Sequence, residues 1–154
     1  MADIYSNENP LFKTLAFYVG VLILKMFFVQ MYTTFQRITK NIYATEEDIT
    51  FADPSGKKVK IDPQNPIVER IRRAHLNDIE NIVPFIFLGI FYISTHPVYS
   101  TTLLVFRIFT AARFLHSFVY LAHVRQPFRV LSFGVGIAVN IFMAVSIVMF
   151  YSKV

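Results

Sequence analysis

The sequence predicts an all-α membrane protein, a bundle of four transmembrane helices in one integral membrane domain over residues 1–154. Of its 154 residues, 55% are hydrophobic and only 16% are charged, whereas a soluble globular domain carries about 25% charged residues. The mean hydropathy is +0.48, and the apolar residues gather into long stretches. Because about 20 consecutive apolar residues are enough to span the bilayer hydrocarbon, these stretches are expected to cross a membrane.

Four helices follow from the apolar stretches. The first covers 11–37, where Asn9 and Pro10 form a common helix opening. The second is apolar only over 82–93, which is too short to span, so it must include the polar segment before it and run over 67–95. The third covers 101–122 and the fourth 128–151. A polar loop over 38–66 joins the first two helices.

The distribution of positive charge predicts the orientation in the membrane. Most of the 15 Lys and Arg residues lie in the long loop and the helix ends beside it: Arg37, Lys40, Lys57, Lys58, Lys60, Arg70, Arg72, Arg73, Arg125 and Arg129. Since positive loops stay on the cytosolic side, we expect a cytosolic loop and lumenal termini. The net charge of +5 is then a topology signal, and no nucleic-acid partner is predicted. The four histidines lack metal-ligand spacing and there is no cysteine, so no metal site is predicted either.

Polar side chains form a stripe on each helix, towards its cytosolic half. On the second helix they recur at i, i+3, i+7 and i+10. The stripes comprise Gln30, Thr33, Thr34 and Arg37; Arg70, Arg73, Asn77 and Glu80; Arg113, His116 and Tyr120; and Arg129, Ser132, Gly136 and Asn140. Ionisable groups at membrane depth usually face a cavity or a partner. The stripes therefore predict a polar cavity open to the cytosol.

The residue types in this cavity suit a small peptide with several carboxylates. Arginine forks bind carboxylates, a glutamate binds an ammonium group, and an asparagine pairs with peptide groups. Arg129 stands at the start of the fourth helix, where its charge adds to the positive end of the helix dipole and favours an anion such as a thiolate.

Structural roles are the alternatives. Arg70, Arg72 and Arg73 could bind acidic lipid headgroups, and Glu80 could form a buried ion pair with Arg73 or Arg113. His116 and Tyr120 could simply bond between helices. Lys25 and Arg107 are interpreted as salt bridges within the bundle or as charges that snorkel to its surface.

Residues 69–85, ERIRRAHLNDIENIVPF, closely resemble the signature of the membrane-associated proteins in eicosanoid and glutathione metabolism, the MAPEG superfamily. Within it, the chain is most similar to the microsomal glutathione transferase branch. The resemblance extends over essentially the whole chain, through Phe106-Arg107-Ile108-Phe109, Ala112-Arg113, His116, Tyr120-Leu121, Gln126-Pro127, Arg129 and Phe133.

The resemblance implies a homotrimer of four-helix subunits that binds glutathione between neighbouring subunits near the cytosolic face. Arg129 matches the arginine that supports the glutathione thiolate, which makes it the expected catalytic residue. The other positions expected to bind glutathione are Arg37, Arg72, Arg73, His75, Asn77, Glu80, His116 and Tyr120, with Arg37 contributed by the adjacent subunit. Asp48 matches an acid with a proposed role in the prostaglandin E synthase branch.

Two departures from the family patterns bear on the activity. The reactive loop cysteine through which the mammalian transferase is activated is absent, because the chain has no cysteine. Val130 replaces the serine that follows the thiolate-binding arginine in the prostaglandin E synthase branch, and Phe133 replaces a tyrosine of that branch. These differences favour a transferase over a glutathione-dependent isomerase. A non-catalytic lipid-presenting scaffold, like the 5-lipoxygenase-activating protein, is the third alternative.

The predicted function is therefore that of a membrane-bound glutathione transferase that acts in detoxification. It would conjugate the glutathione thiolate to hydrophobic electrophiles that arrive from the lipid bilayer, and reduce lipid hydroperoxides as a peroxidase. Most of the rate enhancement would come from positioning of the reactants and from stabilisation of the glutathione thiolate. The expected location is the endoplasmic reticulum membrane, with the mitochondrial outer membrane as the alternative.

Overall fold

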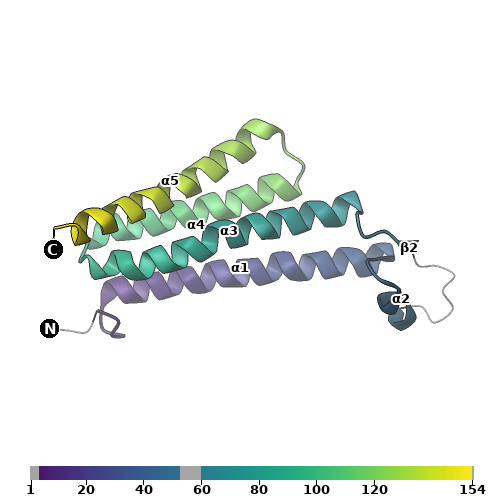
Figure 1. Ribbon diagram of the computed structural model, residues 1–154, viewed down its shortest axis with the longest axis horizontal. Helices are drawn as coiled ribbons and strands as arrows, with labels where there is room; N and C mark the ends of the chain where they lie inside the picture. Colours follow the sequence, from purple (N-terminus) through teal and green to yellow (C-terminus); the bar gives the residue numbers. More distant parts are fainter. Residues whose placement is uncertain (1–3, 53–59, 154) are drawn as a thin grey trace.

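Four long helices run side by side along the length of the molecule, as the sequence predicts (Figure 1). The computed structural model describes residues 4–52 and 60–153. Its long helices are α1 (Pro10–Lys40), α3 (Pro66–Ser94), α4 (Tyr99–Leu121) and α5 (Gln126–Tyr151). Each of these four described helices is long and apolar enough to cross a membrane.

Local signals in the sequence explain where the helices begin. Asn9 and Asn65 cap α1 and α3, since their side-chain oxygens accept from the backbone N–H of Leu11 and Ile67 at 2.9 and 3.1 Å. A proline stands in the first turn of α1, α3 and α5. At this position a backbone N–H has no acceptor within the helix, so its absence in proline costs no hydrogen bond. Helix α5 therefore begins at Gln126, two residues before the predicted start, because Pro127 fits within its first turn.

The segment predicted as a loop over 38–66 contains regular structure. Helix α1 continues to Lys40, and Asn41 ends it in the left-handed conformation with φ of 51°. A short helix, α2 (Glu46–Ala52), follows, with acidic side chains in the first turn that favour the positive end of its dipole. Strands β1 (Ile42–Tyr43) and β2 (Lys60–Ile61) pair in parallel. Lys57 and Lys58, counted in the predicted orientation, lie outside the described residues.

Helices α3 and α4 form the centre of the bundle. Helix α1 packs against α3 and α4 on one side, and α5 packs against the same two helices on the other. Both chain ends lie at one end of the bundle, whereas α2 and β2 lie at the opposite end (Figure 1). The end away from the termini therefore brings together the last turns of α1 and α4 and the first turns of α3 and α5.

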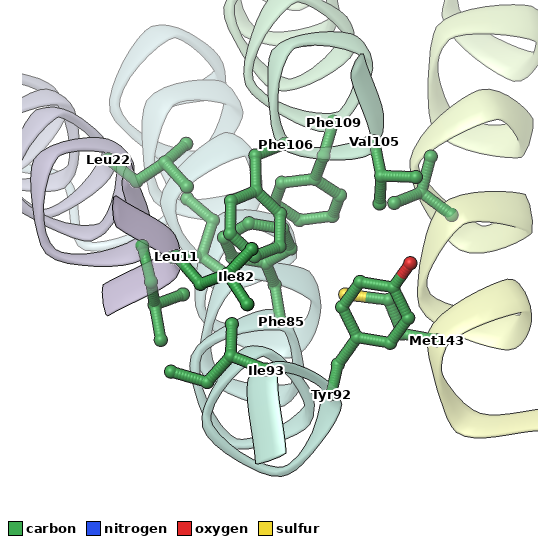
Figure 2. Packing of buried hydrophobic residues seen from close by; sticks show 12 residues of the cluster. Leu11, Leu22, Ile82, Phe85, Tyr92, Ile93, Val105, Phe106, Phe109 and Met143 are labelled. Carbon is green, nitrogen blue, oxygen red and sulfur yellow. The ribbon is translucent and has the colours of Figure 1, made fainter. Parts of the chain in front are cut away.

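Aromatic side chains dominate the apolar core. The rings of Phe85 and Phe109 stack with centroids 4.0 Å apart, and Phe106 meets Phe85 edge to face at 5.3 Å. Figure 2 shows these rings packed with Leu22 of α1 and Met143 of α5 nearby, so all four long helices contribute. Stacked and edge-to-face ring pairs add stabilisation beyond the area they bury. This core fixes the rotation of each helix and hence the direction in which its polar stripe points.

Candidate functional site

Charged groups are buried in the middle of the bundle, beside the aromatic core. Lys25 Nζ of α1 donates to Asp78 Oδ1 of α3 at 2.5 Å, and Arg113 Nη2 of α4 lies 3.5 Å from the same oxygen. Ser117 Oγ donates to the carboxylate of Asp78 at 3.3 to 3.4 Å. The side chains of Asp78 and Arg113 are fully buried. We call these four residues the buried ion cluster.

The buried ion cluster settles two of the sequence interpretations. Lys25 forms a salt bridge within the bundle, as proposed. The suggested buried ion pair of Glu80 with Arg73 or Arg113 is wrong, because Glu80 is exposed on α3 and the acid that faces Arg113 is Asp78. The signal that could have identified Asp78 is its register, since it continues the buried stripe of Ile71, Ala74, Ile82 and Phe85.

Arg113 also connects the buried ion cluster to two of the predicted site residues. Its Nη2 donates to Asn77 Oδ1 at 2.6 Å and lies 2.9 Å from His116 Nδ1. Asn77 belongs to the polar stripe of α3, and His116 lies one turn after Arg113 on α4. A single guanidinium nitrogen therefore holds one side chain from each of the two central helices.

Asn77 and His116 line a hollow that opens between α3, α4 and α5. One part, of about 270 Å³, is lined by Asn77, His116, Tyr120, Gln126, Arg129, Val130 and Phe133. A second part, of about 610 Å³, shares Tyr120 and Arg129 and adds Gln64, Pro66, Glu69, Arg70 and Arg73. We call both parts together the α3–α5 hollow. Its α5 residues belong to the first turns of that helix, and Figure 1 shows these turns standing apart from α4.

Arg129 lines both parts of the α3–α5 hollow. It lies in the first turn of α5, and its guanidinium carbon lies 4.7 Å from the centre of the Tyr120 ring. A guanidinium over an aromatic face is held in place without losing its hydrogen-bond donors. Within the described ranges, no acidic side chain forms a salt bridge with Arg129 or Arg73. Their positive charges therefore remain available to an anion in the hollow, next to the positive end of the α5 dipole.

A second hollow, of about 450 Å³, lies between α1 and α3. Arg37, Arg72, Arg73 and His75 line it, together with Gln30, Thr33, Thr34, Glu69, Leu76 and Ile79. Arg72 lies beside Glu69, with its Nη1 2.5 Å from the carboxylate, and more than half of its side chain is exposed. We call this space the α1–α3 hollow. Arg73 lines both hollows, so α3 forms the ridge between them.

The predicted site residues thus divide into two groups within one chain. Asn77, His116, Tyr120 and Arg129 meet in the α3–α5 hollow, whereas Arg37, Arg72 and His75 face the α1–α3 hollow. Glu80 is exposed and lines neither hollow. Asp48 of α2 lies farther out, in a space of about 730 Å³ that it shares with Arg37.

Three polar residues that line the hollows belong neither to the predicted polar stripes nor to the predicted glutathione-binding positions. Gln64 precedes α3, Glu69 lies in its first turns, and Gln126 begins α5. Each lies at or near the start of a helix, whereas the polar stripes were defined mainly by residues in the helix interiors. The proximity of helix starts at the same end of an antiparallel bundle is the signal that could have found them.

Comparisons with known proteins agree over most of the chain. Residues 15–149 match the model of the MAPEG family. Microsomal glutathione S-transferase 1 of Mus musculus is 41% identical over 145 residues, which cover 94% of each chain. The human protein of that name is 39% identical, covering 89% of this chain and 88% of its own. Prostaglandin E synthase of Equus caballus is 35% identical over 75% of this chain and 73% of its own.

Proposed function

The chain belongs to the MAPEG family, as residues 69–85 predicted, and we propose that it is a membrane-bound glutathione transferase. It would join the glutathione thiolate to hydrophobic electrophiles. The observation that carries this proposal is the α3–α5 hollow, where hydrogen-bond donors from three helices converge with arginines that form no salt bridge among the described residues. The relatives named microsomal glutathione S-transferase 1, which match nearly end to end, support glutathione as the co-substrate.

The residues of the α3–α5 hollow divide the task between them. Arg129, at the N-terminal end of α5, holds the sulfur as a thiolate by its charge and by the helix dipole. Arg70 and Arg73 bind the carboxylates of the peptide as bidentate partners. Asn77, His116 and Tyr120 bind its amide and carboxyl groups. The thiolate then forms a carbon–sulfur bond with the electrophile, whose leaving group departs with the electron pair.

An apolar groove supports entry of the electrophile from the bilayer. It measures about 410 Å³ and lies between α4 and α5, lined by Ile108, Ala111, Ala112, Leu115, Phe128, Leu131, Ser132 and Val135. Phe128 and Leu131 flank Arg129 along the first turns of α5. A lipid hydroperoxide that enters the same way would be reduced to the alcohol and water while two glutathione molecules are oxidised to the disulfide. This peroxidase activity is part of the proposal.

A homotrimer would complete the site. Arg37, Arg72 and His75 face the α1–α3 hollow on the other side of α3 from Arg129, so one chain does not enclose a peptide with all the predicted residues. Contact between the first helix of one subunit and the α3–α5 hollow of its neighbour would add Arg37 to the site. We place the protein in the endoplasmic reticulum membrane, with the mitochondrial outer membrane as the alternative, and the segment between α1 and α3 in the cytosol.

Ultraviolet difference absorbance tests the proposal directly. Glutathione titrated into the detergent-purified protein should give a saturable thiolate band, and the protein should conjugate a small apolar electrophile such as a chloronitrobenzene. Arg129→Ala should lose the band while the oligomer stays intact by size-exclusion chromatography. A folded wild-type protein without the band would overturn the transferase assignment and favour a lipid-presenting scaffold.

The prostaglandin E synthase relative makes an isomerase the second candidate. Val130 lines the α3–α5 hollow directly after Arg129 and offers no hydroxyl group there, which favours the transferase. Incubation with prostaglandin H2 and glutathione separates the two. Rapid formation of prostaglandin E2, with no conjugation of chloronitrobenzene, would favour the isomerase over the transferase.

A further inference from the structure

Arg113 lies on the polar stripe predicted for α4, but the sequence did not place it among the residues expected to bind a ligand. Its side chain is fully buried and so does not reach the α3–α5 hollow. The two residues that it contacts most closely, Asn77 and His116, do line that hollow. Arg113 thus stands behind the wall of the proposed site and contacts the residues that form it.

The chemistry of the guanidinium fixes the roles of its two partners. Arginine has only donors and stays protonated in proteins. The Asn77 atom that faces it must therefore be the carbonyl oxygen, and the His116 nitrogen that faces it must be an acceptor without a proton. An imidazolium is excluded beside Arg113 Nη2 because both of its nitrogens carry protons. His116 is therefore neutral, with its proton on Nε2.

The same geometry leaves donors for the hollow. With Oδ1 of Asn77 occupied by Arg113 at 2.6 Å, the amide Nδ2 is the group left to donate. With Nδ1 of His116 occupied at 2.9 Å, the Nε2–H is left to donate. Both residues line the same 270 Å³ space as Arg129. Each would otherwise be free to present either a donor or an acceptor, and an acceptor would repel a carboxylate or a thiolate.

Arg113 also contacts groups on two other helices, α3 and α5. Asp78 Oδ1 lies 3.5 Å from its Nη2 and is also bound by Lys25 of α1. On α5, Gly136 leaves the room that the side chain occupies, since a Cβ there would lie 3.4 Å from Nη1. A long side chain fixed at its tip by charge and along its stem by packing has lost its rotamer freedom before any ligand binds.

The geometry points to Arg113 as a positioning residue that orients Asn77 and His116 as hydrogen-bond donors to the anionic groups of glutathione. This inference deepens the proposed function and rests on it for the identity of the ligand. The assignment of His116 as the neutral Nε2–H form does not depend on the ligand and is tested without it.

The first experiment uses the wild-type protein alone. Histidine labelled with ¹⁵N distinguishes the two neutral forms and the imidazolium by nitrogen NMR, and a His116→Gln variant assigns the signal among the four histidines. We expect His116 as the neutral Nε2–H form. The Nδ1–H form or an imidazolium would overturn the inference, even if the protein proved not to bind glutathione.

The second experiment measures glutathione binding in Arg113→Lys, which keeps the buried charge but loses the planar fork. We expect the glutathione Kd to rise roughly tenfold or more, with the KM for the electrophile unchanged. Arg107→Lys is the matched control, because Arg107 is exposed on the same helix and donates to Tyr18 at 3.2 Å; its Kd should stay at the wild-type value. An unchanged Kd in Arg113→Lys would overturn the inference.

A double-mutant cycle separates positioning from a general structural role. If Arg113 acts through Asn77, the combined effect of Arg113→Lys and Asn77→Ala on Kd should fall at least roughly threefold below the product of the separate effects. Independent effects that multiply would contradict positioning. If Arg113→Lys does not fold, the NMR measurement on the wild-type protein still decides.

Discussion

The buried ion cluster and the α3–α5 hollow use the same residue types in opposite ways. In the buried ion cluster, Arg113 and Lys25 surround Asp78 with no access to solvent. In the α3–α5 hollow, Arg129 lies against the Tyr120 ring, and no carboxylate of the described residues forms a salt bridge with it. An arginine that is buried against an acid partner belongs to the structure of the bundle, whereas Arg129, which forms no salt bridge among the described residues, remains available for a ligand.

This difference also predicts what a substitution in each region will change. Removing one partner of a buried ion pair leaves an uncompensated charge in a medium of low dielectric, so stability should fall. Removing a cation from the α3–α5 hollow should lower the activity and change the stability little. Four substitutions test this separation, from the largest expected effect to the smallest.

Asp78→Asn should give the largest loss of stability. It leaves Lys25 and Arg113 buried without a counter-charge, which costs about 3–5 kcal/mol in comparable cases. The free energy of unfolding in detergent measures it. Glu80→Gln is the matched control, two residues along α3 but exposed, and should stay within about 0.5 kcal/mol of wild type. Equal losses in the two variants would mean that the buried ion cluster is not a stabilising unit.

Arg129→Ala should give the largest loss of activity. Removing a group that stabilises the reacting anion lowers the rate roughly 10²- to 10³-fold, so kcat/KM for chloronitrobenzene conjugation should fall by that factor while the unfolding midpoint hardly moves. Arg125→Ala is the control, because Arg125 is exposed just before α5 and lines neither hollow. Comparable losses in both variants would show that the charge of the segment, rather than the position of Arg129, supports the reaction.

Gly136→Val should have an intermediate effect because Gly136 lies against Arg113, which belongs to the buried ion cluster and contacts two residues that line the α3–α5 hollow. A Cβ at this position would already be in van der Waals contact, 3.4 Å from Arg113 Nη1 and 3.5 Å from its Cδ, so the two methyl groups of valine would crowd the guanidinium. Overpacking of this kind costs about 1–3 kcal/mol, measured again by unfolding in detergent. Gly134→Val, where nothing lies within 4 Å of the added Cβ, should leave stability within about 1 kcal/mol of wild type. Stability that is the same in the two variants would contradict a close approach of α5 to Arg113.

Arg72→Ala should have the smallest effect on stability. Its salt bridge with Glu69 is exposed, with more than half of the arginine side chain in solvent, and such pairs contribute about 0–1 kcal/mol. The unfolding midpoint of Arg72→Ala, compared with wild type at low and high salt, measures this. A loss as large as that of Asp78→Asn would mean that the α1–α3 hollow, too, is a closed structural cluster.

The sequence was a better guide to which residues line the hollows than to which of these residues share the same hollow. The i, i+3, i+7 spacing placed Arg113, His116 and Tyr120 on one face of α4, and the structure has His116 and Tyr120 in the same hollow. It also placed Glu80 with Arg73 and Asn77, but Glu80 is exposed and lines neither hollow. The spacing along one helix defines a polar stripe broad enough to face two neighbouring helices. Only the packing of those helices decides which residues of the stripe face which hollow.

The helices and the end of the bundle that carries the polar groups were determined by the sequence itself, because hydropathy, caps and prolines act within a few residues of one another. The tertiary structure alone decided that Asp78 and not Glu80 neutralises Arg113, and that α3 separates the site residues into two hollows. Both depend on the rotation of each helix about its axis. That rotation is fixed by contacts between distant parts of the chain, such as the stacking of Phe85 on Phe109 and the approach of Gly136 to Arg113, and no periodicity within a single helix specifies them.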